Sequence, residues 1–356
     1  MTVETEEASL AQTTERVKVL VDGRLAGFLD EHAAPVADPE VAAAYRLLRR
    51  FILGGGKRIR PLLCYWGWRG AGGEESDQII SAGSALELCH AGLLIHDDIM
   101  DGSELRRGAP TMHRSLAGMH EGPGAPSFGH AAAILMGVLT LAWSDELLSA
   151  SDVEPGRLRA ARALFDRLRA EVITGQYLDI LAQVRDLSTV EQALMVVRYK
   201  TAKYTVERPL QIGGALAGAD PVLLEAYSEI GLPLGEAFQL RDDILGMFGD
   251  PAQTGKSVLD DLREGKHTIL IAHAFQHASG AEARHLGAWH GNPSLTEERA
   301  AELRDIVVST GALARVEAMI ADRSRDALHA LHAAPVDPLA RSGLAVLAGG
   351  LIDRTR

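Results

Sequence analysis

The sequence predicts an all-helical protein, and three observations carry this prediction. The chain is rich in Ala, Leu, Arg and Glu, it contains long segments with the helical hydrophobic period, and it has few alternating runs of β-branched residues. Its 356 residues are 47% hydrophobic, which is enough for one substantial core. We therefore expect a single helical bundle rather than two separate domains.

The first helix is expected to start after a polar tail. Residues 1–14 are polar, and we expect them to be disordered, so that the folded domain spans residues 15–356. Helical periodicity begins near Glu15 and again over residues 39–53, after which three consecutive glycines end the helix.

Glycine and proline mark the later breaks between helices. A loop rich in both over residues 118–129 precedes an apolar helix over residues 130–148. Further breaks are expected at residues 151–155, 213–221, 249–255 and 279–293. Each joins helical segments at spacings that are normal for one bundle.

Charge and cysteine content argue against several classes of protein. Lys and Arg total 36 against 48 Asp and Glu, a net charge of −12, so no general attraction to nucleic acid or anionic lipid is expected. Cys64 and Cys89 are too few for a disulfide framework and lie in apolar segments. The sequence shows no signal-peptide pattern and no uninterrupted apolar run of about 18 residues. We expect a cytoplasmic protein without a membrane span.

Two aspartate-rich segments dominate the sequence. The first reads His-Asp-Asp-Ile-Met-Asp over residues 96–101, and the second reads Gln-Leu-Arg-Asp-Asp-Ile-Leu-Gly over residues 239–246. Helix residues four apart lie on one face, so Asp97 and Asp101 project together. Two such faces set opposite each other would present the hard oxygen ligands that Mg²⁺ binds together with phosphate oxygens. A solvated acidic surface is the alternative, but both segments follow apolar runs, which indicates buried helices.

The segment Gly55-Gly56-Lys57-Arg58-Ile59-Arg60 predicts a second anion site. Its glycines allow the backbone to approach an anion, while Lys57 and Arg60 reach the same side at the start of a helix. A basic helix start after a glycine cap is the alternative interpretation. A nucleotide-binding P-loop at Gly255-Lys256-Ser257 is a poor match, because Asp250 stands where that motif needs glycine.

Together these motifs resemble the trans-prenyltransferases, the isoprenyl diphosphate synthases that make farnesyl, geranylgeranyl and longer diphosphates. The resemblance runs from about Leu47 to about Ala272, in family order. It rests on the DDxxD with its trailing Arg-Arg-Gly, the DDxxG, the glycine-lysine segment, Gly175-Gln176-Tyr177-Leu178-Asp179, Lys200-Thr201 and Gly265-Lys266. It implies an isoprenoid synthase bundle with a deep central cavity. It also implies a homodimer, for which residues 130–148 are the best candidate face.

The same resemblance implies Mg²⁺, three ions per active site with Mn²⁺ as a substitute, and assigns roles residue by residue. Isopentenyl diphosphate, which needs no metal, would be bound by Lys57, Arg60, His90 and Arg107. The metal ligands for the allylic diphosphate would be Asp97, Asp101 and Asp242, supported by Asp98, Asp243 and Asp179. The phosphate oxygens left over would be neutralised by Arg106, Lys200, Lys256 and Lys266. The allyl cation would face the oxygen dipoles of Lys200, Thr201 and Gln239.

The implied reaction starts with ionisation of dimethylallyl, geranyl or farnesyl diphosphate. Breaking the allylic carbon–oxygen bond places negative charge on the leaving group and positive charge on the allyl group, so cations must gather at one end of an otherwise apolar, dry cavity. The isopentenyl double bond then attacks, and the released pyrophosphate takes the final proton. No nucleophilic side chain is required.

Product length is expected to depend on residues one turn or more before the first aspartate, because each isoprene unit adds ~4–5 Å, close to one helical turn. These positions hold Gly92, Leu93 and Cys89, and none carries a ring. Geranylgeranyl diphosphate is therefore favoured, with farnesyl or geranylfarnesyl and longer products as alternatives. Met136 and Trp143 of the facing helix are further candidates for the cavity floor.

Two rival functions are weaker. A class I terpene cyclase shares the DDxxD but normally adds a motif that runs from Asn or Asp through Ser or Thr to Glu, and the one asparagine, Asn292, lies in a Gly-Asn-Pro turn. A non-catalytic subunit of a heteromeric synthase should have lost metal carboxylates, which are intact here. One departure from the family is Gly246, where many relatives have a third aspartate that would help to bind the third metal.

Overall fold

The computed structural model describes residues 3–185, 189–249 and 259–352, and these residues are almost entirely helical. Contacts between Cα atoms divide the chain into two compact units, unit 1 (Met1–Arg162 and Ile212–Ala219) and unit 2 (Ala163–Gln211 and Asp220–Arg356). Two helices, α7 (Pro155–Gln183) and α9 (Arg208–Ala217), begin in one unit and end in the other. The all-α prediction is confirmed, and the expectation of a single domain stays a prediction.

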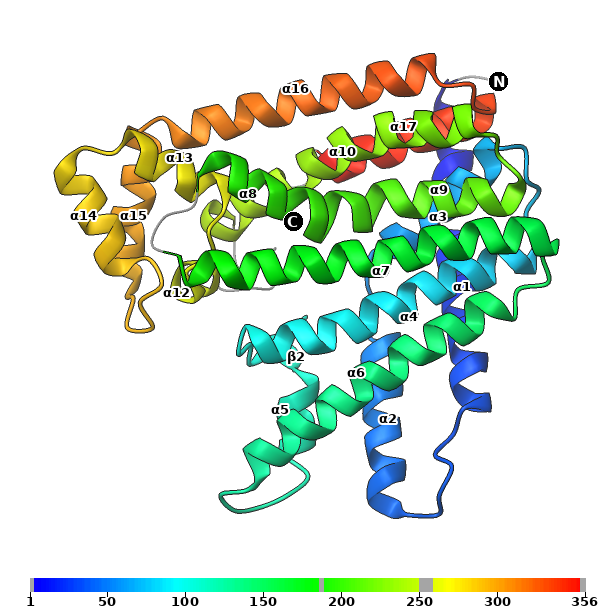
Figure 1. Ribbon diagram of the computed structural model, residues 1–356, viewed down its shortest axis with the longest axis horizontal. Coiled ribbons are helices and arrows are strands. Elements are labelled where there is room, and N and C mark those ends of the chain that lie inside the picture. The colour runs from blue at the N-terminus through cyan, green and yellow to red at the C-terminus, as the bar shows by residue number, and fades with distance from the viewer. Residues whose placement is uncertain (1–2, 186–188, 250–258, 353–356) are drawn as a thin grey trace. The chain divides into compact units, whose positions relative to one another are not determined.

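Unit 1 is built around α4 (Asp77–Met100), which packs against α1, α3 and α6. Figure 1 shows α4 and α6 running alongside each other. The other elements of this unit are α1 (Val3–Glu31), α2 (Pro39–Leu53), α3 (Ile59–Gly70), β1 (Leu105–Arg106), β2 (Ala109–Pro110), α5 (Met112–Ala117) and α6 (Ala125–Ser149). Residues 79–89 of α4 are all buried, so this helix forms the core of the unit.

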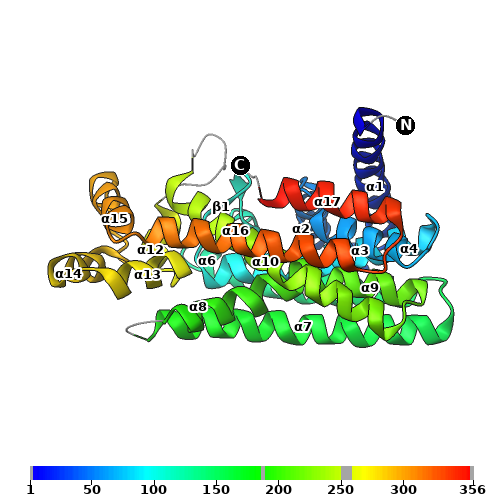
Figure 2. The same ribbon diagram turned by 90° about the horizontal axis from the view of Figure 1, so that it is seen from above.

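Unit 2 is built around α10 (Pro221–Phe248), which packs against the π-helix η1 (Val197–Glu207) and α16 (Ala312–Ala333). Figure 2 shows α16 lying along α10. The remaining elements are α8 (Val190–Val196), α12 (Asp260–Glu264), α13 (Ile269–His277), α14 (Gly280–Trp289), α15 (Glu297–Ser309) and α17 (Pro338–Ile352). Asp220 starts α10 because its side chain accepts a hydrogen bond from the backbone N–H of Leu223 at 2.8 Å.

Several helix bounds depart from the sequence prediction; for example, α6 begins at Ala125, inside the loop expected over residues 118–129. α1 begins at Val3, although helical periodicity was expected only from about Glu15. The break expected over residues 279–293 was wrong, because α14 lies within it. A capping box starts that helix: Ser279 accepts from the backbone N–H of Glu282, whose side chain accepts from the backbone N–H of Ser279.

Among the residues described, two helices are long and apolar enough to cross a membrane by length and composition alone, namely α4 and α6. The apolar window of α4 is 78% buried inside the protein, as in a core helix, whereas that of α6 is 39% buried. The absence of a membrane span therefore stays a prediction. The low burial of α6 leaves an apolar surface on unit 1.

Candidate active site

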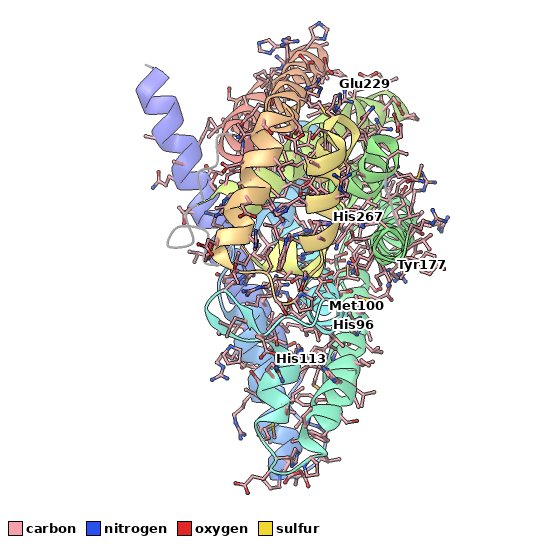
Figure 3. The ribbon with its side chains drawn as sticks, turned by 90° about the vertical axis from the view of Figure 1, so that its left-hand side faces the viewer. His96, Met100, His113, Tyr177, Glu229 and His267 are labelled. Atoms are coloured by element: carbon pink, nitrogen blue, oxygen red, sulfur yellow. The ribbon has the colours of Figure 1, made fainter. Side chains whose placement is uncertain are left out.

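The first aspartate segment forms the end of α4. Asp97 and Asp98 lie in its last turn, and Asp101 caps the helix, with its backbone N–H donating to the carbonyl oxygen of Asp97 at 2.8 Å. Figure 3 shows His96 and Met100 at this end of the helix. The C-terminal end of a helix carries partial negative charge, and the last turn of α4 contains no basic residue. Carboxylates so placed repel the helix end, and a bound cation would relieve that repulsion.

Arg106 and Arg107 stand on a small hairpin that follows α4. Its strands β1 and β2 pair antiparallel, with Arg106 opposite Ala109. Arg107 and Gly108 form the turn with φ angles of 53° and 74°, as a type I′ turn requires. The hairpin gives the two arginines different partners.

Arg106 is held by Asp98. Its Nε donates to the two carboxylate oxygens of Asp98 at 2.7 and 2.9 Å, and its Nη2 lies 4.0 Å from Oδ2 of Asp97. Burial raises the pKa of the fully buried Asp98, and the ion pair with Arg106 opposes this shift. Asp98 itself does not face solvent, and its role in this structure is to hold Arg106 beside Asp97.

Arg107 lies against the glycine-lysine loop. Its guanidinium donates to the carbonyl oxygen of Gly55, and a Cβ placed on Gly56 would lie only 3.0 Å from its Nη2. Gly56 also has a φ of 140°, which other residues rarely adopt. The exposed Lys57 follows directly, so glycine at position 56 lets Arg107 approach this loop.

His90 lies among arginines of unit 1. Burial lowers the pKa of His90 well below its ordinary value, and the charges of Arg60, Arg107, Arg106 and Arg58 lower it further. A neutral imidazole surrounded by permanent positive charge suits an anion. The sequence-predicted residues Arg60, His90 and Arg107 thus interact with one another.

The second aspartate segment lies in about the last three turns of α10, where the last turn again contains no basic residue. Thr201 donates its hydroxyl to Oε1 of Gln239 at 2.7 Å, and Nε2 of Gln239 donates to Oδ1 of Asp243 at 2.7 Å. Three predicted residues are therefore joined in one hydrogen-bonded chain. Asp242 is the partly buried neighbour of Asp243.

The helix η1 that carries Thr201 is closely approached by glycines of two neighbouring helices. A Cβ on Gly235 of α10 would lie 2.5 Å from Cα of Ala202, and a Cβ on Gly175 of α7 would lie 2.2 Å from the backbone nitrogen of Lys200. Any larger residue at either position would push η1 away. The glycine of the predicted Gly-Gln-Tyr-Leu-Asp motif thus has a packing role.

The lysines predicted for the allylic diphosphate have carboxylate partners in unit 2. Lys200 donates its Nζ to Oδ2 of Asp179 at 2.6 Å, and Nζ of Lys266 lies 2.8 Å from Oε2 of Glu264. Asp179 is buried, so in this structure it supports Lys200. Lys256 lies outside the described residues.

His290 holds the turn that carries Lys266, and sequence reasoning missed it. Its Nε2 lies 3.1 Å from the carbonyl oxygen of Lys266. Burial, followed by the charge of nearby His267, lowers the pKa of His290 to about 4, so the imidazole is neutral and its Nε2–H donates. No local pattern signals this contact, because the two residues are 24 positions apart.

The donor set fits Mg²⁺ bound together with a diphosphate. Within residues 3–185, 189–249 and 259–352, no group of three His, Cys, Asp or Glu side chains could hold a metal by itself. Mg²⁺ usually takes one or two carboxylates and completes its octahedron with waters and substrate phosphates. The oxygens of Asp97 and Asp101 at the α4 end, and of Asp242 at the α10 end, have that chemistry.

The residues predicted to set product length have different surroundings. A Cβ on Gly92 would lie 2.9 Å from the carbonyl oxygen of Gly137 and 3.0 Å from Cγ of Leu141, so Gly92 permits the close packing of α4 on α6. Cys89 is fully buried, and Leu93 is only partly buried. Leu93 is therefore the least buried of the three positions and the best suited to a larger side chain.

The facing-helix candidate Trp143 has a packing role. Its ring makes edge contacts with Phe28, His32 and Tyr45, with centroids 6.2, 5.6 and 5.9 Å away. Phe28 lies on α1, His32 directly follows it and Tyr45 lies on α2, so Trp143 anchors α6 to both helices. The other candidate, Met136, is partly buried.

Comparison with known proteins assigns the chain to a family. Residues 42–307 match the family model described as polyprenyl synthetase, which is most of the chain. The chain belongs to the polyprenyl synthetase family. It is 34% identical over 309 residues to a geranylfarnesyl diphosphate synthase from Aeropyrum pernix, covering 86% of this chain and 92% of that protein.

Two further relatives are named as geranylgeranyl diphosphate synthases. The chain is 34% identical over 242 residues to one from Methanosarcina mazei, covering 68% of this chain and 70% of that protein. The other is a crystal structure from Corynebacterium glutamicum, complexed with isoprenyl diphosphate and magnesium. It has a TM-score of 0.91 and 38% identity, and covers 96% of this chain and 99% of that one.

This member of the polyprenyl synthetase family is a prenyltransferase that elongates isoprenyl diphosphates. The prediction of an isoprenyl diphosphate synthase is confirmed. The family binds isopentenyl and allylic diphosphates and uses a divalent metal.

Proposed function

We propose that the chain condenses isopentenyl diphosphate head to tail (1′–4) with allylic diphosphates and releases geranylgeranyl diphosphate. The observation that carries this proposal is the pair of aspartate-bearing helix ends, one on α4 and one on α10, together with a separate cluster of arginines around His90. Two chemically different settings suit a reaction that joins two diphosphates.

The allylic diphosphate would be bound by the aspartate helix ends. Asp97, Asp101 and Asp242 would bind Mg²⁺, which when bound neutralises the diphosphate leaving group. Asp98 holds Arg106 beside Asp97 through their ion pair. We propose three ions per site, with Mn²⁺ able to replace Mg²⁺.

The hydrogen-bonded chain of Thr201, Gln239 and Asp243 would support the ionisation step. The Gln239 and Thr201 oxygens are dipoles that stabilise an allyl cation without capturing it. The ammonium group of Lys200 is paired with Asp179, and that of Lys266 with Glu264. Diphosphate oxygens would compete with these carboxylates for the two ammonium groups. Once the new carbon–carbon bond has formed, the isopentenyl unit carries the positive charge, and the released pyrophosphate would take the proton that this unit loses.

Isopentenyl diphosphate would be bound in unit 1 by four cationic or polar side chains, which we call the cradle: Lys57, Arg60, His90 and Arg107. The planar guanidinium of an arginine matches two phosphate oxygens at once and stays charged at every physiological pH. The cradle therefore needs no metal.

Geranylgeranyl diphosphate as the product is supported by the absence of a ring at Cys89, Gly92 and Leu93, and by two relatives that carry that name. The test is incubation with dimethylallyl and isopentenyl diphosphates and Mg²⁺, followed by chromatography of the dephosphorylated alcohols. Geranylgeraniol should dominate. Farnesol alone would contradict the open cavity, and geranylfarnesol or longer alcohols would favour the alternative product.

Leu93→Phe gives a second test of product length. A phenylalanine there should shorten the main product to farnesyl diphosphate, because Leu93 is partly exposed on the helix that carries Asp97. Gly92→Phe is a poor probe, because its side chain would meet the backbone of α6. An unchanged alcohol profile for Leu93→Phe would remove this residue from the chain-length site.

We propose that the enzyme is a cytoplasmic homodimer. The apolar face of α6 supports this, because Ile134, Leu135 and Val138 are 47%, 64% and 53% exposed and a second copy would cover them. Cys64 and Cys89 are both buried and form no disulfide, which suits a reducing compartment. Light scattering at micromolar concentration should give a dimer, and Leu135→Glu should give a monomer. A monomeric wild type would contradict the proposal.

A further inference from the structure

Arg58 stands between two cradle residues but does not share their surroundings. Lys57 is exposed and Arg60 is partly buried, whereas Arg58 is only 3% exposed. Its backbone lies in the left-handed region, with φ 50° and ψ 39°, which costs energy for any residue except glycine. Such a conformation persists only where surrounding contacts enforce it.

The guanidinium of Arg58 binds three groups at once. Nη1 donates to Oε1 of Glu87 at 2.6 Å, Nε donates to Oδ1 of Asp22 at 2.8 Å, and Nη2 donates to the carbonyl oxygen of Ile52 at 3.2 Å. Glu87 is buried with 4% exposure, while the side chain of Asp22 is 49% exposed. Because the guanidinium is a rigid planar fork, these bonds fix the loop against α1, α2 and α4.

Glu87 connects this ion pair to the rest of the cradle. It lies three residues before His90 on α4, and therefore on the same helix face one turn earlier. Burial lowers the pKa of Arg107, and the negative charge of Glu87 opposes that shift, so Glu87 interacts with Arg107 as well. The loop is bonded to this carboxylate through Arg58, the helix α4 carries it, and its charge acts on Arg107 of the hairpin.

We propose that the buried Arg58–Glu87 ion pair is a positioning device for the cradle, in which Arg58 holds the loop from its buried side and does not bind phosphate. This proposal rests on the proposed assignment of the cradle to isopentenyl diphosphate. A shift of about 1 Å in a positioned group can cost up to about 10²-fold in rate. Loosening the loop should therefore weaken isopentenyl diphosphate binding and leave the metal-dependent ionisation of the allylic substrate intact.

Glu87→Gln is the first variant. It leaves Arg58 buried with only Asp22 as a charged partner. The KM for isopentenyl diphosphate should rise about tenfold, while kcat and the KM for geranyl diphosphate change less than about twofold. Tm should also fall, because a buried charge has lost its partner.

Glu75→Gln is the matched control. Glu75 also links α1 to α3 and accepts from Arg16 and from the hydroxyl of Tyr65 at 3.1 Å, but it lies near the other end of α3. Its loss should lower Tm slightly and leave the KM for isopentenyl diphosphate unchanged. An equal rise in that KM for both variants would overturn the proposal, because the effect would then be general.

The double variant Arg58→Met with Glu87→Leu separates positioning from stability. Replacing a buried ion pair by apolar side chains of similar volume often restores or raises stability, and Asp22 would be left solvated. Tm should therefore recover relative to Glu87→Gln, while the KM for isopentenyl diphosphate stays about tenfold above the wild type. A KM that recovers together with Tm would overturn the proposal.

Arg58→Lys and Lys57→Ala complete the test. Lysine keeps the charge but cannot reach three partners at fixed angles, so folded Arg58→Lys should show a KM for isopentenyl diphosphate raised severalfold. An unchanged KM in that variant would overturn the positioning role even if the double variant fails to fold. An unchanged KM in Lys57→Ala would instead overturn the cradle itself, and the positioning role with it.

Discussion

The two aspartate-bearing helix ends are similar in sequence but differ in the groups that surround them. At the end of α4, the buried Asp98 binds Arg106, and further arginines gather around the neutral His90. At the end of α10, Asp243 accepts from the neutral Gln239, and the nearby lysines of unit 2 have carboxylate partners. Positive charge therefore gathers around His90 in unit 1, whereas the lysines of unit 2 are paired with carboxylates of their own unit.

This difference separates two ways of binding a diphosphate. Arginine stays charged when it is desolvated and binds phosphate directly, so the unit 1 cradle can act without a metal. The helix end of α10 presents carboxylates and neutral dipoles, which can hold a diphosphate only through a bound cation.

The largest loss of turnover is expected from substitutions of the aspartates that both helix ends carry. Asp97→Ala and Asp242→Ala should each lower kcat by roughly 10² or more, because each removes a ligand to a metal that stabilises the leaving group. Asp145→Ala, which removes a partly exposed partner of Arg162, is the control and should keep near-normal turnover. Near-normal rates for either test variant with Mg²⁺ would show that its helix end does not bind the metal.

A smaller and more selective effect is expected in the unit 1 cradle. Arg107→Ala should raise the KM for isopentenyl diphosphate about tenfold with little change in kcat, because it removes a phosphate contact present before and during reaction. Arg114→Ala, an exposed arginine of the same unit paired with Glu104, should change neither constant. If Arg107→Ala mainly lowers kcat, the cradle takes part in ionisation and the division fails.

The opposite selectivity is expected for Thr201 in unit 2. Thr201→Val removes the hydroxyl that donates to Gln239 at 2.7 Å, so kcat should fall about tenfold while the KM for isopentenyl diphosphate is unchanged. Thr201→Ser keeps the hydroxyl and should retain most activity. Steady-state kinetics with geranyl diphosphate as the allylic substrate would measure kcat and KM for both variants. If Thr201→Val is as active as Thr201→Ser, the hydroxyl of Thr201 does not stabilise the allyl cation.

The smallest effect concerns pH and stability in unit 2. The pKa of His290 is about 4 in the folded protein against about 6.5 for a free histidine, so the folded state favours the neutral ring. This contribution is complete above about pH 6.5 and is lost as pH falls towards 4, by at most about 3 kcal/mol. His290→Gln can still donate to the Lys266 carbonyl, so its Tm should fall less than that of the wild type between pH 7 and pH 4.5. Parallel Tm curves would contradict the assignment.

The sequence predicted best what depends on local spacing. The helical period predicts Asp97 and Asp101 on one face and brings Gln239 close to Asp243, and the structure has Asp97, Gln239 and Asp243 on helices, with Asp101 as the cap of α4. The sequence predicted poorly what depends on contacts between distant segments. Neither the link from Glu87 to Arg58 nor that from His290 to Lys266 has a local signature.

Local backbone geometry explains the other differences. The two arginines of the Arg-Arg-Gly motif separate because Arg107 has a positive φ, a conformation that spacing alone does not reveal for a residue other than glycine. The helix α14 was missed because Gly280 and Pro293 suggested a break, although Ser279 and Glu282 form a capping box.

The most direct test of the division is equilibrium binding of each substrate alone, measured by calorimetry with Mg²⁺ and with a chelator. Isopentenyl diphosphate should bind with affinities that agree within about threefold in the two conditions, because arginines of unit 1 carry the interaction. Farnesyl diphosphate should bind with Mg²⁺ and lose most of its affinity in the chelator. Loss of isopentenyl diphosphate binding when the metal is removed would contradict the central claim that the two helix ends and the cradle bind diphosphates by different chemistry.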